Sequence, residues 1–206
     1  MSNINFFRVM AKGGNKGITP FDPPFVPQYL MVTYEFTDGT DLDTRTRIVS
    51  PDVGQTSIGD YLGYSFDTQW PSSSAYLLWG GDNTGTGFES VLWYIDDFAT
   101  AYPSNNIVTL DFRAFWYTTT GSNPVNIDVT LWRGGTPTKS SFIWVNTTAT
   151  NTYNVASVSK QITLTNNPPD PITSNNPGER VCTLTYNISQ GSGNLNSNDT
   201  TTPMVP

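Results

Sequence analysis

The residues of this chain best suited to chemistry are aspartates clustered early in the sequence. Asp38, Asp41 and Asp43 fall within six residues, in the segment Thr37–Thr46. Carboxylate oxygens at this density are typical of Ca²⁺ sites, because Ca²⁺ takes about six to eight hard oxygen ligands. The glycine and terminal glutamate of an EF-hand loop are out of register here. The alternative interpretation is a turn in which the aspartates cap backbone donors and Arg45 neutralises one carboxylate.

A second polar loop, Trp79–Glu89, could complete such a site. It holds four glycines in eight residues, which permit close backbone approach and positive φ angles. No Gly-Lys-Ser/Thr follows, so a phosphate-binding P-loop is not predicted. If the two loops meet, they would add oxygen ligands to Asp41 and Asp43 from Asp82, Asn83 and Glu89. The alternative is a wide hairpin loop without a ligand.

Most catalytic constellations are excluded by residue type. The chain contains no histidine, which removes Ser-His-Asp and Cys-His catalysis and His-ligated zinc. The single cysteine, Cys182, alternates with apolar residues and reads as a small buried hydrophobe. Asp96 and Asp97 end a predicted strand, where successive side chains face opposite sides and cannot form a close acid–base pair. A glycan hydrolase using Asp41, Asp43, Asp82 or Glu89 is therefore only the third hypothesis for function.

The six tryptophans raise the possibility of a sugar-binding surface. Trp132 falls on the polar face of its predicted strand, beside Asn126, Asp128 and Thr130, so we expect it to be exposed. An exposed tryptophan can stack on a sugar ring or anchor a protein interface. A carbohydrate-binding module or receptor-binding fibre head is accordingly the second hypothesis.

Composition excludes several kinds of partner. The net charge is −7, and the few lysines and arginines form no basic run, so we expect neither nucleic acid nor an anionic membrane surface as a partner. No apolar stretch is long enough to span a membrane. The first residues lack the charged and apolar regions of a secretory signal, so we expect synthesis in the cytosol without general secretion.

The pattern that must position these residues is all-β. Only 13% of residues are charged and 13% are aromatic, with abundant threonine and asparagine, a profile that favours strands over helices. Polar–apolar alternation and turn signals predict a single β-sandwich or jelly-roll domain over 28–188. The predicted strands are Gln28–Phe36, Thr44–Val49, Tyr61–Phe66, Ala75–Trp79, Glu89–Phe98, Ile107–Tyr117, Val125–Trp132, Ser141–Val145, Val155–Leu164 and Arg180–Ile188.

Two segments flank the predicted domain. Residues 1–27 read as an extended arm rich in proline and glycine, with Phe21, Phe25 and Val26 as side chains that insert into a partner surface. Residues 189–206 read as a polar, low-complexity tail. Such a tail buries too little apolar area to order alone, so a neighbouring subunit, a larger assembly or its own domain would have to hold it.

The chain resembles virion proteins of tailed bacteriophages, particularly head decoration proteins and head fibres. The resemblance rests on the arm Thr19–Pro27, the threonine- and asparagine-rich β core, the acidic surface and the polar tail, and on the segments Asp41–Thr46 and Trp79–Gly85. It implies a non-enzymatic structural protein of the virion, made in the host cytoplasm, that attaches to the capsid or to its own copies. This is the first hypothesis for function.

Overall fold

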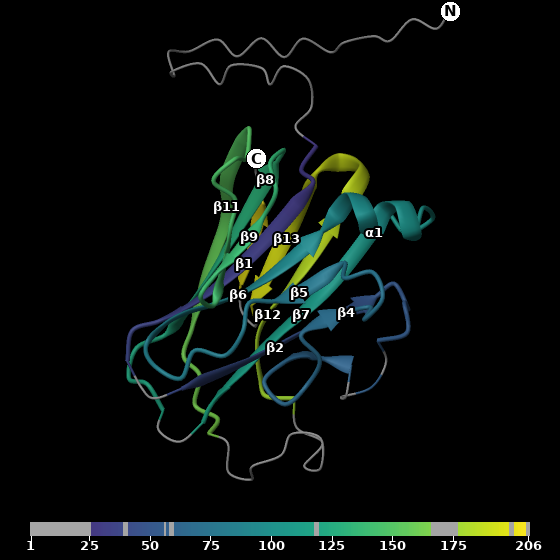
Figure 1. Ribbon diagram of the computed structural model, residues 1–206. Coiled ribbons are helices and arrows are strands. Elements are labelled where there is room, and N and C mark those ends of the chain that lie inside the picture. Colours follow the sequence, from purple (N-terminus) through teal and green to yellow (C-terminus); the bar gives the residue numbers. More distant parts are fainter. Residues whose placement is uncertain are drawn as a thin grey trace, which may run out of the picture.

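A computed structural model describes residues 26–38, 41–55, 57, 60–117, 120–165, 177–197 and 200–204. The predicted all-β sandwich is confirmed, because two six-stranded antiparallel sheets pack face to face (Figure 1). Within the described residues, these sheets hold all the strands except those of a short separate hairpin. The elements are β1 (Tyr29–Phe36), β2 (Leu42–Ser50), β3 (Leu62–Gly63), β4 (Gln69–Trp70), β5 (Leu77–Trp79), β6 (Gly87–Tyr94), α1 (Ile95–Ala101), β7 (Ile107–Trp116), β8 (Val125–Arg133), β9 (Thr138–Ser140), β10 (Ile143–Val145), β11 (Asn151–Lys160), β12 (Glu179–Asn187), the 3₁₀ helix η2 (Ile188–Gln190), β13 (Ser192–Ser197) and β14 (Thr200–Met204).

The chain passes back and forth between the two sheets. Sheet A has the strand order β11-β8-β1-β6-β5-β4, and sheet B has the order β14-β13-β12-β7-β2-β3. Consecutive strands such as β1 and β2 therefore belong to different sheets, and the loops that join them cross from one layer to the other. This crossing brings loops of both sheets together at the ends of the sandwich.

The core lies between the sheets and follows the alternation that the sequence predicts. Val108, Leu110 and Phe112 of β7 are buried, as are Ile127 and Val129 of β8. Each large apolar side chain removed from water in this way stabilises the fold by about 1.5–3 kcal/mol. The predicted inward faces of these two strands are confirmed.

The predicted strand Glu89–Phe98 is wrong at its end. The run Glu89–Phe98 does not continue as a strand, because β6 ends at Tyr94 and α1 begins at Ile95 (Figure 1). Ile95 and Phe98 are both buried, and their three-residue spacing suits one face of a helix. Asp96 and Asp97 lie in the first helical turn, where acidic side chains favour the helix dipole. They line a small cavity of about 140 Å³ together rather than facing opposite sides.

The predicted polar tail over 189–206 is largely part of the sandwich. β13 pairs with β12 and β14 pairs with β13, so the sheet extends to Met204 and the predicted domain boundary at 188 is wrong. Leu195, directly opposite Leu184 of β12, is fully buried and fixes the register of the hairpin. Its own domain therefore holds this segment.

The remaining predicted features are an arm and a buried thiol. Phe21 and Phe25 lie outside the described residues, and Val26, where the description begins, is 49% exposed. Cys182 has no exposed surface, and burial raises the pKa of its thiol far above the ordinary value. The interpretation of Cys182 as a buried core residue is confirmed.

Candidate functional site

Three of the predicted acidic ligands converge in the structure. Asp41 precedes β2, Asp43 is the second residue of β2, and Asp82 lies in the loop between β5 and β6. One carboxylate oxygen from each lies within 4.8 Å of the other two. Asp41 and Asp43 are two positions apart, so an extended backbone turns both side chains to the same face. We call this group the acidic site.

Asp43 is the innermost member of the acidic site. It is 1% exposed, and neither of its carboxylate oxygens has a hydrogen-bond partner among the described residues. One oxygen of Asp41 and one of Asp82 are likewise buried without a partner. Burial raises the pKa of Asp43 to about 7, with Asp41 and Asp82 adding to the rise against the opposing effect of Arg45. Burial and the nearby Asp82 raise the pKa of Asp41 to about 6.

Glu89 lies beside the acidic site but has partners of its own. It is fully buried and accepts hydrogen bonds from the Thr44 hydroxyl, from Trp79 Nε1 at 3.3 Å and from the Asn83 backbone N–H at 3.0 Å. Burial raises the pKa of Glu89 to about 8, although these hydrogen bonds oppose the rise. Since Thr44 belongs to β2 and Asn83 to the loop after β5, Glu89 positions the loop that carries Asp82.

Arg45 supplies the nearest positive charge without making an ion pair. Its guanidinium is fully buried between the rings of Phe66 and Phe115, at 4.8 and 4.9 Å from their centroids. Nη1 donates to the Thr44 carbonyl at 2.9 Å, while Nε and Nη2 have no partner among the described residues. Within those residues no ion pair joins Arg45 to Asp43. Burial lowers the pKa of Arg45 to about 10, so it stays charged at neutral pH.

A glycine allows Arg45 to be covered. Gly63 of β3 lies opposite Arg45 in the sheet and has a φ of +143°. A Cβ at this position would lie 2.0 Å from the Thr44 carbonyl oxygen, so only glycine lets β3 approach β2 this closely. The segment that contains β3 and Phe66 therefore packs against the side of β2 that carries Asp43 and Arg45.

Asp38 does not belong to the acidic site, so its prediction as a metal ligand is wrong. Its carboxylate accepts hydrogen bonds from the Ser122 hydroxyl, from the Ser122 N–H at 2.9 Å and from the Asn123 N–H at 3.1 Å. These bonds, chiefly the one from the Ser122 hydroxyl, lower the pKa of Asp38. Asp38 therefore ties the turn after β1 to the loop between β7 and β8. The sequence could not reveal this partner, which lies more than eighty residues away.

Trp132 is not the exposed platform that the alternation of β8 predicts. It is 4% exposed and lies between Tyr29 of β1 and Thr152 of β11 in the register of sheet A. The Tyr29 hydroxyl donates to the Gly135 carbonyl at 3.2 Å, in the loop that follows β8. The alternation correctly assigns Trp132 to the outer face, but it cannot show that other parts of the chain cover this face.

The β9–β10 hairpin follows β8 and folds over the outer face of sheet A at β6. Ser90 of β6 donates through its hydroxyl to the Phe142 carbonyl at 3.1 Å and accepts from the Trp144 N–H at 2.9 Å. Gly80 permits this docking, because a Cβ there would lie 2.2 Å from the Phe142 carbonyl oxygen.

Comparison with protein-family models and with curated protein sequences finds no match for this chain. None of the helices in the described part of the chain has the length and hydrophobicity needed to cross a bilayer.

Proposed function

We propose that this protein is a non-enzymatic β-sandwich module that binds a divalent cation, Ca²⁺, at the acidic site formed by Asp41, Asp43 and Asp82. The observation that carries the proposal is Asp43, a carboxylate that is 1% exposed and has no hydrogen-bond partner among the described residues. Burying a charge without a partner costs several kcal/mol, so native proteins pair such groups or use them as metal ligands.

Asp111 is a buried carboxylate whose hydrogen bonds explain its burial, and it serves as a comparison for Asp43. It lies on the same side of sheet B, on β7, and is also 1% exposed. Tyr61, Arg113 and Arg180 all donate to it at distances of 2.7–2.8 Å, and these bonds lower its pKa. The contrast with Asp43 supports a missing positive partner at the acidic site.

The balance of charge fits a divalent ion. The three aspartates and Arg45 together carry two negative charges when all four are ionised, which one divalent cation neutralises. Asp41 and Asp82 are only partly buried, so they lead from solvent to Asp43. Ca²⁺ tolerates irregular oxygen geometry and a mixture of carboxylates and water, whereas Mg²⁺ demands near-octahedral ligands. The ion would join a strand of sheet B to a loop of sheet A.

Use of the same carboxylates for glycoside hydrolysis has less support. A glycosidase needs two carboxyl groups that flank a sugar in a cleft. Asp43 and Glu89 are almost completely buried, and Glu89 already accepts three hydrogen bonds. These two residues cannot reach a glycosidic bond without opening the fold.

A further hypothesis is that this module works in a virion, where it attaches to other virion proteins or to copies of the same chain. Val26, next to the predicted arm, is about half exposed and could contact a partner. Removal of residues 1–27 should then abolish association with a capsid or with other copies, measured by sedimentation, while the sandwich stays folded. Unchanged association would contradict this hypothesis.

The cation proposal is tested by titrating Ca²⁺ into chelator-treated protein, with calorimetry and thermal unfolding as readouts. We expect one bound ion per chain and a rise in Tm, because a ligand that binds only the folded state stabilises it. In Asp43→Asn both effects should vanish. The chelator-treated variant should be more stable than the chelator-treated parent at mildly alkaline pH, by about 1–3 kcal/mol, because an unpaired buried charge is removed.

Asp128→Asn is the matched control. Asp128 lies on the outer face of sheet A, on β8, and its replacement should leave Ca²⁺ binding unchanged. Titrations with Mg²⁺ and Mn²⁺ establish the preference for the ion. The proposal would be refuted if none of the three ions binds, or if Asp43→Asn binds Ca²⁺ as tightly as the parent protein does.

A further inference from the structure

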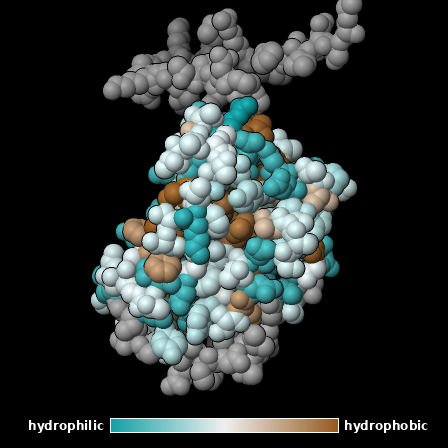
Figure 2. Space-filling view, viewed as in Figure 1, coloured by the Kyte–Doolittle hydropathy of each residue, from teal (hydrophilic) through white to brown (hydrophobic). Residues whose placement is uncertain are grey.

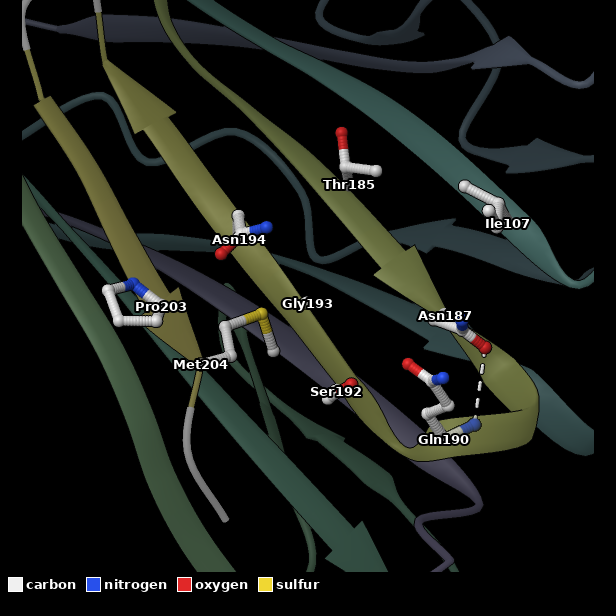
Figure 3. A pocket seen from close by; sticks show the side chains of 9 residues that line it. All are labelled: Ile107, Thr185, Asn187, Gln190, Ser192, Gly193, Asn194, Pro203 and Met204. Carbon is white, nitrogen blue, oxygen red and sulfur yellow. Dashed lines mark hydrogen bonds between the residues drawn. The ribbon is translucent and has the colours of Figure 1, made fainter.

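A groove of about 420 Å³ lies at the C-terminal hairpin, on sheet B (Figure 3). The close view shows side chains from β7, β12, β13 and β14 around it, with the β12–β13 turn at one end. Ile107 begins β7, whereas Phe115, the neighbour of Asp43 in sheet B, lies near the other end of that strand. The groove is therefore separate from the acidic site. Its lining residues are Ile107, Thr185, Asn187, Gln190, Ser192, Gly193, Asn194, Pro203 and Met204.

The register of the strands explains why these side chains gather. Thr185 of β12 lies opposite Asn194 of β13, and Asn194 lies opposite Pro203 of β14. In the next row, Asn187 lies between Ile107 and Ser192. The alternate residues Leu184 and Leu195 point into the core, so the polar side chains must point outward. The segment that the sequence predicts as a polar tail thus builds one wall of the groove.

The lining is uncharged, although the chain as a whole carries a net charge of −7. Its polar groups are amides and hydroxyls, each of which both donates and accepts hydrogen bonds. Sugar hydroxyls have the same double capacity. Ile107, which is 57% exposed, and Pro203 add apolar surface that suits the C–H face of a pyranose ring. A volume of this size lies in the usual range for small-ligand pockets.

Other ligand classes fit less well. A peptide strand binds by pairing with free backbone groups at a sheet edge. The backbones of β12 and β13 are already paired on both sides, so the floor of the groove offers only side chains. A nucleic acid or phosphate ligand would need lysine or arginine, and none lines the groove.

We propose that this groove binds a neutral saccharide through Thr185, Gln190 and Asn194. This inference goes beyond the cation site and does not depend on it. It assigns the sugar-binding surface to sheet B rather than to Trp132. Figure 2 shows one face of the molecule, on which hydrophilic and pale residues predominate and the hydrophobic residues form small patches.

The experiment is an NMR titration of the ¹⁵N-labelled full chain with a panel of neutral disaccharides, including maltose, cellobiose, lactose and N,N′-diacetylchitobiose. We expect at least one of them to shift the amide signals of residues 185–194 and the side-chain amide signals of Gln190 and Asn194. Replacing Asn194 with leucine, or Thr185 with valine, removes hydrogen bonds at little change in size. Either variant should weaken binding by about fivefold to tenfold.

Asn151→Leu and Thr152→Val are the matched controls. Both residues are exposed on β11, at the edge of sheet A, and these variants should bind the disaccharide as the parent does. No shift with any disaccharide at tens of millimolar, or shifts that map only to other surfaces, would overturn the inference. Equal loss of binding in the control variants would also overturn it, because the effect would then not belong to the groove.

Discussion

At the scale of single residues, the outer side of sheet B presents two buried carboxylates with opposite surroundings. Asp111 receives hydrogen bonds from Tyr61, Arg113 and Arg180, whereas Asp43 receives none within the described residues. The first stabilises the fold as it stands. The second costs stability until a cation or a proton neutralises it, which makes it the better candidate for function.

Asp111→Asn should destabilise the protein by about 2–3 kcal/mol at neutral pH. This loss is smaller than the loss from breaking a fully buried ion pair, because Arg180 is nearly half exposed and water can solvate its charge. The Asp111 pKa is lowered, so this contribution is present above the ordinary carboxyl pKa of 3.8 and is lost as the pH falls below it. Chemical denaturation at neutral and at acidic pH measures both effects. An equal loss in the mutant at both pH values would contradict the assigned role of the carboxylate.

The sequence could identify residues that interact over short distances, but not their distant partners. The sequence places Asp41 and Asp43 together and offers Asp82 as a further ligand only if two segments meet, and the structure brings the three carboxylates together. The roles of Asp38 and Trp132 were not predicted, because Asp38 binds a loop far away in sequence and Trp132 is buried on the outer face of sheet A. No local pattern encodes those contacts.

At the scale of elements, substitutions in β13 test whether the C-terminal segment stabilises the fold. Leu195→Ala should cost about 2–4 kcal/mol, since Leu195 is fully buried opposite Leu184. Asn196→Ala, one position along on the outer face, should cost less than about 0.5 kcal/mol. Equilibrium denaturation measures both. Similar small effects from the two substitutions would mean that the hairpin adds nothing to the core.

The elements that sequence patterns recovered are those with strict alternation over a long run. β7 and β8 have large apolar side chains at every second position, so their inward faces were predictable. β13 has a single leucine among glycine, serine and asparagine, which is too weak a signal to distinguish a strand from a flexible segment.

At the scale of the whole molecule, the acidic site and the neighbouring Glu89 should determine how stability depends on pH. The pKa values of Asp41, Asp43 and Glu89 are raised to about 6, 7 and 8 in the folded protein. The folded state therefore binds more protons than the unfolded state. Without a cation, stability should fall as the pH rises from about 4 through these values.

Thermal unfolding at mildly acidic, neutral and mildly alkaline pH, with chelator and with Ca²⁺, measures this dependence. With chelator the Tm should fall toward alkaline pH, and saturating Ca²⁺ should abolish most of the fall, because the ion replaces the protons. Asp43→Asn should flatten the chelator curve. Identical slopes with chelator and with Ca²⁺ would show that the carboxylates do not share an ion.

The burial of Cys182 has a practical consequence for following the dynamics of the sandwich. It is the only cysteine in the chain, it lies on a central strand of sheet B, and it has no exposed surface. A thiol-modifying reagent can reach it only when β12 separates from the core, so the rate of labelling reports the frequency of that opening. Adding or withdrawing Ca²⁺ during such labelling would reveal whether an ion at one end of the molecule changes how often its centre opens.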